Sequence, residues 1–171
     1  MLVGVVSDTH DNAQYVEAAV EAFADAGADA VIHCGDIVAP FSATPFDPDA
    51  VDGSDADWEF HAVRGNNDGE WALADAVGGF GTYHGEFASL TLDGTEFAVY
   101  HGTSEPIVDA LIASESYDYV LRGHTHERVH EEHKGTVHLN PGGVPIPGRE
   151  EAPTAMLVDT ASGDVTVRDL G

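Results

Sequence analysis

Residues 2–10 read LVGVVSDTH, and this stretch decides the fold. It begins with an apolar run of strand length, typical of a buried β-strand, which ends directly in polar residues. Asn12 stands where it can cap a helix that we predict over residues 13–26, and Gly27 supplies the stop at the end of that helix. The chain therefore opens with the strand, polar loop and helix that α/β folds repeat.

The pattern of a strand followed by polar residues recurs further along the chain. We predict strands at residues 30–33 and 58–63, and both runs lead into a glycine with an acidic or amide neighbour. Residues 39–57 are rich in proline, aspartate and serine and predict a loop with one helical turn. A short helix is expected near residues 70–76. The first half of the chain is thus predicted to contain successive strand and helix units.

The second half of the chain is predicted to be rich in strands. Residues 87–92 and 96–100 flank Asp93-Gly94, which is a strong signal for a two-residue hairpin turn. Further elements are predicted as a helix at 105–114, a strand at 117–121 and short antiparallel strands at 128–133, 136–139, 155–159 and 165–168. Early strand and helix units followed by a strand-rich half favour an α/β fold of two stacked mixed sheets with helices outside.

Composition and charge limit the classes of protein to which the chain can belong. The 171 residues carry 6 basic and 31 acidic side chains, a formal net charge of −25, and 43% are hydrophobic, which is enough for a sizeable core. The length fits a single domain over residues 1–171. No run reaches the roughly 18 apolar residues of a membrane span, and no secretory signal is visible. One cysteine, Cys34, excludes an internal disulfide. We therefore expect a soluble, cytoplasmic protein.

The acidic residues are scattered along the whole chain, which predicts a surface adapted to high salt. At about 1 M salt the screening length falls to roughly 3 Å, so repulsion between carboxylates is largely suppressed. The alternative is an acidic surface that binds a basic partner. Six basic residues cannot form a stripe that follows phosphates, so a nucleic-acid polymer is disfavoured as a partner. A homo-oligomer is left open.

Side chains that suit metal ions stand at five predicted strand ends. They are Asp8 with His10, Asp36, Asn66 with Asp68, His101, and His124 with His126. Ligands gather beyond the carboxyl ends of strands in open α/β sheets, so these ends can converge on one site. Carboxylate, imidazole and amide groups without thiolate suit Mn, Fe, Zn or Ni. The donors are too many for one ion, so we expect two divalent ions that share a carboxylate.

The same residue types also occur in ordinary turns and helix caps, where aspartate and asparagine are common. Four histidines among seven donors at successive strand ends favour ligands over turn-forming residues. The other histidines, expected at the surface or in the core, are His33, His61, His84, His130, His133 and His138. Cys34 is expected to be a small buried side chain rather than a nucleophile.

The ordered motifs resemble those of the calcineurin-like metallophosphoesterases, and in particular the small YfcE-type phosphodiesterases. The motifs are SDTH at 7–10, GD at 35–36, GNND at 65–68, HG at 101–102, GHTH at 123–126 and NPGG at 140–143. The resemblance covers almost the whole chain and implies a four-layer α/β/β/α sandwich. It also implies a small phosphodiester as substrate, hydrolysed by a hydroxide that bridges two metal ions, with manganese expected before nickel, iron or zinc.

Carried over by position, the resemblance assigns a role to each candidate residue. Asp8, His10 and His126 would hold the first ion; Asn66, His101 and His124 would hold the second; Asp36 would bridge the two. Asp68 would orient a ligand or a water molecule. Asp36, Asn66, Asp68 and His101 are the expected catalytic residues, and Arg64 and Arg149 are candidates to contact the substrate phosphate, although both could instead form surface ion pairs.

Asn67 departs from the wider superfamily, where the motif is often GNHD and the histidine can protonate the leaving oxygen. An amide cannot do this, so weak help to poor leaving groups is expected. Three alternatives stay open: a phosphomonoesterase, a hydrolase of cyclic phosphodiesters, and a catalytically weak protein-binding scaffold like the retromer subunit that resembles this family. A repair nuclease would need further domains and a basic groove, which this chain lacks.

Overall fold

The structure is a computed structural model and describes residues 1–51, 55–146 and 152–171. In chain order its elements are β1 (Leu2–Val6), α1 (Ala13–Ala26), β2 (Ala30–His33), α2 (Pro40–Ala43), η1 (Thr44–Phe46), η2 (Pro48–Ala50), β3 (Glu59–Ala62), α3 (Glu70–Val77), β4 (Thr82–Tyr83), β5 (Phe87–Leu92), β6 (Thr95–Tyr100), α4 (Glu105–Ala113), β7 (Tyr119–Leu121), β8 (Val129–His133), β9 (Thr136–Asn140), β10 (Thr154–Asp159) and β11 (Val165–Asp169).

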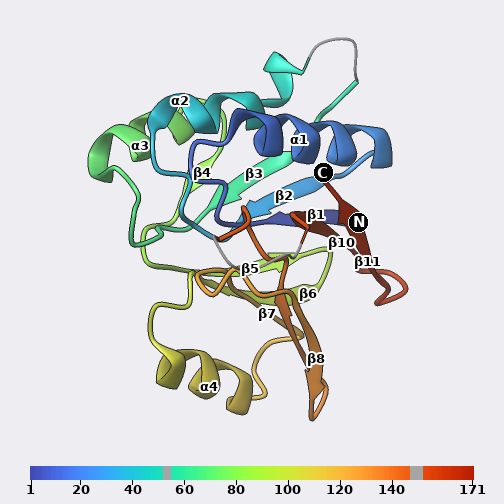
Figure 1. Cartoon of the computed structure of the whole chain (residues 1–171). Coiled ribbons are helices and arrows are strands. Elements are labelled where there is room, and N and C mark those ends of the chain that lie inside the picture. The colour runs from blue at the N-terminus through green and yellow to red at the C-terminus, as the bar shows by residue number, and fades with distance from the viewer. Residues whose placement is uncertain (52–54, 147–151) are drawn as a thin grey trace.

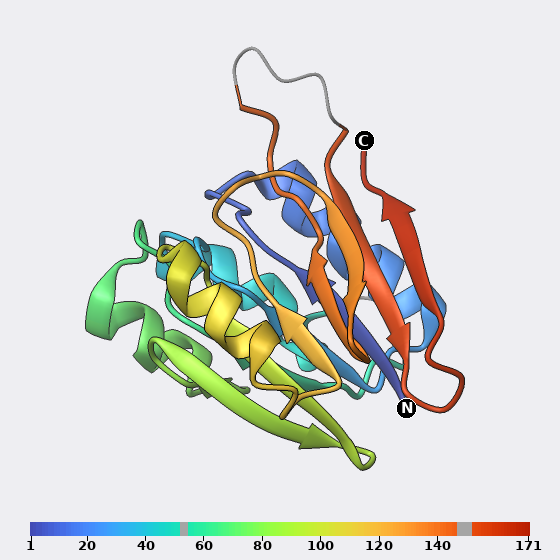
Figure 2. The same cartoon turned by 90° about the horizontal axis from the view of Figure 1, so that it is seen from below.

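Two stacked sheets with helices on their outer faces form the molecule (Figure 1). The first sheet has 6 strands in the order β11-β10-β1-β2-β3-β4, and the second has 5 strands in the order β5-β6-β7-β9-β8. Helices α1, α2 and α3 cover the first sheet, whereas α4 lies over the second, as the view from below also shows (Figure 2). The predicted sandwich of two mixed sheets between helices is therefore confirmed.

Alternation along β1 explains why both of its faces are covered. Val3 and Val5 belong to the core between the two sheets, whereas Val6 belongs to the core beneath α1. Between them, Gly4 faces the helix, and a Cβ atom there would lie 2.7 Å from the Phe23 ring. Glycine at this position therefore lets α1 pack closely on the sheet, where Phe23 is completely buried.

Parallel pairing brings the polar loops to one edge. Strands β1, β2, β3 and β4 are parallel neighbours in the first sheet, and β6 and β7 are parallel neighbours in the second. The carboxyl ends of parallel strands lie at the same edge of a sheet, so the loops that follow them meet. This is the edge where the motifs of the sequence lie.

Three features of the fold differ from the predictions. The stretch predicted as a loop with one helical turn contains α2, η1 and η2, each of which begins with a proline in its first turn, where the missing N–H costs nothing. The two-residue strand β4 was not predicted, because it is too short to show a pattern. The strands after β7 were expected to be antiparallel, but β9 pairs in parallel with β7 and antiparallel with β8.

The helix predicted at 13–26 is confirmed, with Asn12 accepting a hydrogen bond from the backbone N–H of Tyr15 and Gly27 in the left-handed conformation at φ 68°. Other predicted boundaries agree to within about two residues, which is the usual spread of helix and strand ends. Among the residues that the structure describes, no helix is both long enough and apolar enough to cross a membrane.

Candidate metal centre

The loops that carry the candidate ligands turn sharply at the ends of their strands. Five of the ligand residues adopt positive φ angles, a conformation that is uncommon for residues other than glycine and concentrates at functional sites. These residues are Asp8 at 53°, His10 at 44°, Asp36 at 60°, His124 at 69° and His126 at 56°. The tight turns direct their side chains into one region.

A first group of donors consists of Asp8, His10 and His126. One carboxylate oxygen of Asp8 lies 3.4 Å from Nε2 of His126 and 3.9 Å from Nε2 of His10. The two histidine nitrogens are 3.3 Å apart, and their rings are stacked with centroids 5.1 Å apart. One ligand atom from each residue can therefore reach a common ion.

A second group consists of Asn66, His101 and His124. The amide oxygen Oδ1 of Asn66 lies 3.1 Å from Nε2 of His101 and 2.9 Å from Nδ1 of His124. These three atoms belong to the residues that the resemblance assigns to the second ion. The structure thus gathers the residues in the two groups that the motifs implied.

Asp36 lies between the two groups. Its Oδ2 atom is 3.5 Å from Nε2 of His10 in the first group and 3.4 Å from Nε2 of His101 in the second. Asp8 also comes within reach of both groups. Oδ2 of Asp8 accepts hydrogen bonds from the Ser7 hydroxyl at 2.6 Å and from the backbone N–H of His124 at 2.9 Å. A single oxygen of Asp36 lies within 3.5 Å of a histidine in each group, which makes Asp36 the candidate to bridge two ions.

Hydrogen bonds fix which nitrogen two of the histidines present to the centre. Nδ1 of His101 donates to the carbonyl oxygen of Cys34, and Nδ1 of His126 donates to that of Val144, both at 2.8 Å. A carbonyl accepts but never donates, so each Nδ1 carries a hydrogen and Nε2 is the nitrogen that faces the acidic groups. Nε2 is therefore the atom that each of these histidines can offer to a divalent cation.

The carboxylates differ in their environments. Burial alone would raise the pKa of Asp36, but hydrogen bonds from His101 and from the backbone and side chain of Asn67 outweigh it and hold that pKa below its usual range. Burial raises the pKa of Asp8, although the charges of His101 and His126 oppose this effect. Asp36 is therefore ionised at neutral pH, as a bridging ligand must be.

Asn67 contacts the candidate bridging carboxylate directly. Its backbone N–H donates to Oδ1 of Asp36 and its side-chain Nδ2 donates to Oδ2, both at 2.8 Å. The sequence indicated only that a general acid is missing here. The structure adds that the amide fixes the orientation of Asp36 from both of its oxygens.

Asp68 holds the surrounding backbone. Its carboxylate accepts hydrogen bonds from the backbone N–H groups of Gly65 at 2.6 Å, Val38 at 2.7 Å and Asp36 at 3.1 Å. These bonds tie the loop after β2 to the loop after β3. Asp68 thus fixes the two loops that supply Asp36 and Asn66.

Two glycines permit close approach at the centre. A Cβ atom on Gly65 would overlap the backbone nitrogen and Oδ1 of Asp36, and a Cβ atom on Gly143 would lie 2.5 Å from Cβ of Asp8. No side chain fits at either position without displacing a candidate ligand. The glycines of the GNND and NPGG motifs are therefore required by packing against the ligands.

The two arginines predicted to contact substrate have different outcomes. Nη1 of Arg64 lies 3.0 Å from a carboxylate oxygen of Glu86, with 41% of the arginine side chain exposed. Arg149 lies outside the described residues.

Sequence reasoning missed Arg122, which is buried. Its guanidinium donates to both carboxylate oxygens of Glu105 and to the carbonyl oxygen of Gly102. Its position directly before the GHTH motif was the available signal.

The remaining histidines lie in other surroundings. His61 and His84 contact each other at 3.1 Å, His138 is buried, and His130 and His133 are exposed. Cys34 is completely buried, and burial raises the pKa of its thiol far above the usual range, which does not suit a nucleophile.

His33 is completely buried beside the centre. Its Nδ1 accepts from the backbone N–H of Gly35 at 3.2 Å, so its Nε2 carries the hydrogen and donates to the Thr9 hydroxyl at 3.1 Å. A second proton would have to replace the bond to Gly35 in a completely buried site. Burial, together with the nearby charge of His101, lowers the pKa of His33 to about 3.

We expect His33 to make the fold sensitive to acid. Its pKa in the folded state is below the value of about 6.5 in the unfolded chain, so protons bind the unfolded state first and stability falls as pH drops from 6.5 toward 3. The slope from one such group is at most about 1.4 kcal/mol per pH unit. Urea unfolding of the metal-free protein in molar KCl at pH 7, 6, 5 and 4 measures it.

The control for this prediction is a matched pair of variants. His33→Asn keeps an acceptor for the Gly35 N–H but does not titrate, so its free energy of unfolding should fall less steeply with acid than that of the wild type. His130→Asn makes the same change at an exposed site and should keep the wild-type slope. Equal slopes in all three proteins would contradict the prediction.

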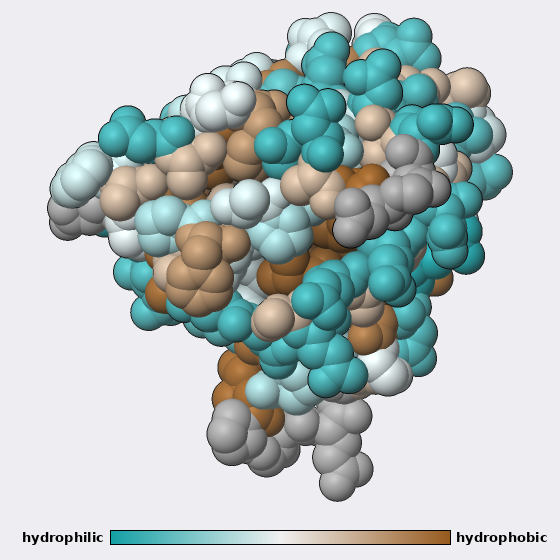
Figure 3. Space-filling view, turned by 90° about the horizontal axis from the view of Figure 1, so that it is seen from above, coloured by the Kyte–Doolittle hydropathy of each residue, from teal (hydrophilic) through white to brown (hydrophobic). Residues whose placement is uncertain are grey.

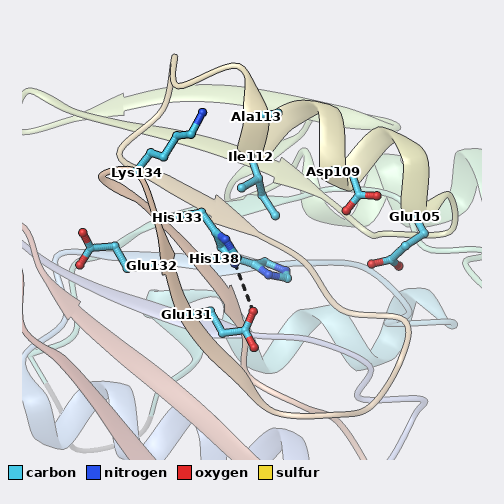
Figure 4. A pocket seen from close by; sticks show the side chains of 9 residues that line it. All are labelled: Glu105, Asp109, Ile112, Ala113, Glu131, Glu132, His133, Lys134 and His138. Atoms are coloured by element: carbon cyan, nitrogen blue, oxygen red, sulfur yellow. Dashed lines mark hydrogen bonds and ion pairs between the residues drawn. The ribbon is translucent and has the colours of Figure 1, made fainter.

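The largest cavity described lies away from the metal centre, between α4 and the β8–β9 hairpin (Figure 4). It has a volume of about 590 Å³ and is lined by Glu105, Asp109, Ile112, Ala113, Glu131, Glu132, His133, Lys134 and His138. None of these residues is a candidate metal ligand. The candidate metal ligands therefore lie outside this cavity.

Comparisons with known proteins agree with the geometry. The family model described as the calcineurin-like phosphoesterase superfamily domain matches residues 1–163. Phosphodiesterase MJ0936 of Methanocaldococcus jannaschii is 35% identical over 145 residues, which cover 83% of each chain. A solved structure described as a novel archaeal phosphodiesterase is 32% identical, with a TM-score of 0.87 and 99% of each chain covered.

A more distant structure supports the fold alone. The phosphoesterase YfcE from E. coli is 19% identical to this chain, with a TM-score of 0.67 over 100% of both chains. The match of the family model to nearly the whole chain, together with the curated relative, shows the family directly. The chain belongs to the calcineurin-like phosphoesterase superfamily and is a phosphoesterase of that family.

Proposed function

We propose that the protein is a phosphodiesterase that uses two divalent metal ions. One observation carries the proposal: a single oxygen of Asp36 lies 3.5 Å from His10 in one donor group and 3.4 Å from His101 in the other. A carboxylate placed between two complete donor groups suits a two-metal centre, in which ions roughly 3.5–4 Å apart act on phosphate esters.

When bound, the ions would supply positive charge that activates water and neutralises the phosphate. The protein's own residues prepare the site for this. Asp8, His10 and His126 would hold one ion, Asn66, His101 and His124 the other, and Asp36 both. Asn67 and the backbone of the loops keep Asp36 ionised and fixed, and Asp68 keeps the two loops together.

Oxygen and imidazole donors without thiolate suit manganese, which we propose as the metal, with nickel, iron and zinc as the other candidates. The substrate we propose is a small phosphodiester rather than a nucleic-acid polymer, because the chain has 6 basic residues against 31 acidic ones. A single cysteine favours a cytoplasmic location.

The proposal is tested by adding each metal separately to the metal-free protein in molar KCl. Hydrolysis is then measured with phosphate diesters, monoesters and cyclic diesters. We expect diesters to give the highest kcat/KM and manganese the highest rates. Faster turnover of monoesters or cyclic diesters would replace the proposed substrate class, and no turnover with any metal would favour a protein-binding scaffold.

Diester hydrolysis should depend steeply on the acidity of the leaving group. The side chain of residue 67 reaches the centre, where it donates to Asp36, yet an amide cannot protonate a leaving oxygen. We expect Asn67→His to raise the rate for poor leaving groups by about 10²-fold, near the lower end of what a general acid contributes. A series of aryl and alkyl diesters measures the slope of log kcat/KM against leaving-group pKa.

Asn67→Ala is the control for that series, because it also removes the hydrogen bond to Asp36 but introduces no acid. It should lower all rates together and leave the slope as steep as in the wild type. A slope that stays unchanged in Asn67→His would contradict this account of residue 67.

A further inference from the structure

A second cavity lies beside the proposed metal centre. It has a volume of about 360 Å³ and is lined by Arg64, Trp71, Ala74 and Tyr83. The lining residues come from the end of β3, from α3 and from β4. Its volume is within the range of about 300–1,000 Å³ that small-molecule sites occupy. None of the residues that line it belongs to the metal-binding motifs.

The backbone connects this cavity to the metal centre. Arg64 directly precedes Gly65 and Asn66, and its backbone N–H donates to the carbonyl of Gly85 at 2.7 Å, which ties the end of β3 to the loop after β4. Tyr83 is close enough to Asp68 for that carboxylate to help raise the tyrosine pKa to about 12, after the larger effect of burial. A group attached to a phosphate at the centre therefore has this cavity beside it.

The chemistry of the lining is aromatic on one side and polar on the other. Trp71 is 74% exposed, which is unusual for so large an aromatic ring. The hydroxyl of Tyr83 and Nε of Arg64 have no hydrogen-bond partner and are shielded from water. Because these two atoms are enclosed, the Trp71 ring and the 41% exposed Arg64 side chain are the parts of the lining that a ligand can contact.

The surface over α2 and α3 carries apolar groups among hydrophilic ones, whereas the surface over α1 is mainly hydrophilic (Figure 3). On the α2 and α3 side, Phe41 is 69% exposed in addition to Trp71. Phe41 does not line the cavity. Exposed aromatic rings thus occur on this side of the molecule, but Trp71 is the one that stands beside polar donors.

From these observations, and resting on the proposed diesterase function, we infer that the cavity binds a planar aromatic group of the substrate, such as a nucleobase. Trp71 stacks on the ring, and the exposed part of the Arg64 side chain lies beside it. Stacking accepts any base, because every base has a π face, so the preference is for aromatic over non-aromatic groups. The substrate class is then a nucleotide-like diester rather than an alkyl diester.

Two phosphate-containing probes test this inference. Adenosine 5′-monophosphate and ribose 5-phosphate share a phosphate and a ribose but differ in the base. We expect the manganese-loaded protein in molar KCl to bind the first about 10-fold more tightly by calorimetry, as stacking of one base allows. Trp71→Ala should reduce this ratio to less than about 2.

Tryptophan fluorescence adds a direct readout. The chain has two tryptophans, and Trp58 is buried with its indole N–H bonded to the carbonyl of Phe46 at 2.9 Å, so quenching by the nucleotide reports on Trp71. Phe41→Ala removes an equally exposed ring outside the cavity and should keep the wild-type ratio and quenching.

Equal binding of the two probes by the wild type would overturn the inference, as would a ratio that survives Trp71→Ala. These outcomes are independent of turnover. If the protein prefers the nucleotide but hydrolyses no diester, the inference about the cavity holds and the proposed function is wrong. If the protein hydrolyses diesters but does not prefer the nucleotide, the proposed function holds and the inference about the cavity is wrong.

Discussion

Replacing Asp36 by Asn should lower kcat/KM for a phosphodiester by about 10³-fold, because the bridging charge supports interactions worth several kcal/mol in the transition state. The substitution removes one negative charge but keeps the size of the side chain. Because Asp36 lies within 3.5 Å of a histidine in each donor group, both ions should bind more weakly. Metal content after dialysis, measured by elemental analysis, should fall well below two ions per chain.

The control for Asp36→Asn is the same change at an exposed site. Asp49 lies in η2, away from the donor groups, and Asp49→Asn should keep both activity and metal content. Circular dichroism and thermal melting of both variants exclude unfolding as the cause of a loss. Full turnover in Asp36→Asn would rule out a catalytic role for the bridging carboxylate.

The second large effect is expected from salt. The melting temperature should rise by more than about 10 °C between 0.1 M and 2 M KCl, because the screening length shortens from about 10 Å to below 3 Å over that range. With 31 acidic and 6 basic side chains, most carboxylates have no cation to pair with. Arg64, Arg122 and Lys134 are moreover already paired with single glutamates.

Thermal melting is measured in KCl, with sucrose at matched osmolarity as the control. Sucrose stabilises proteins because it is excluded from their surface, so the comparison separates that effect from charge screening. A surface adapted to salt predicts a large gain with KCl and a small gain with sucrose. A melting temperature that does not change with KCl would instead favour an acidic surface kept for one basic partner. Binding to such a partner would weaken as salt rises.

Elements with a strong local pattern were predictable from the sequence. The first strand, the capped helix that follows it and the hairpin around Asp93-Gly94 all carry their signals within a few residues. The short helices between Pro40 and Ala50 and the strand β4 were not predictable. Their signals are short, and a proline also fits a loop. The parallel pairing of β9 with β7 depends on contacts distant in sequence, which no local pattern encodes.

The candidate ligands were predictable because their residue types are themselves the signal. What the sequence could not provide is the set of partners that hold them. The bond from Asn67 to Asp36 and the bonds from Asp36 and Val38 to Asp68 join residues about 30 positions apart. The buried position of His33 depends on packing. Such contacts follow from the assembled fold.

The left-handed backbone of the ligand loops should link this protein's abundance to its metal supply. Residues such as Asp36 and His126 hold positive φ angles, each of which costs on the order of 1 kcal/mol. The proposed ions, if they bind the folded loops and not the unfolded chain, would stabilise the folded state by mass action. When metal is scarce, we therefore expect the cell to lose folded protein as well as turnover, because a metal-free chain would unfold and be degraded more often.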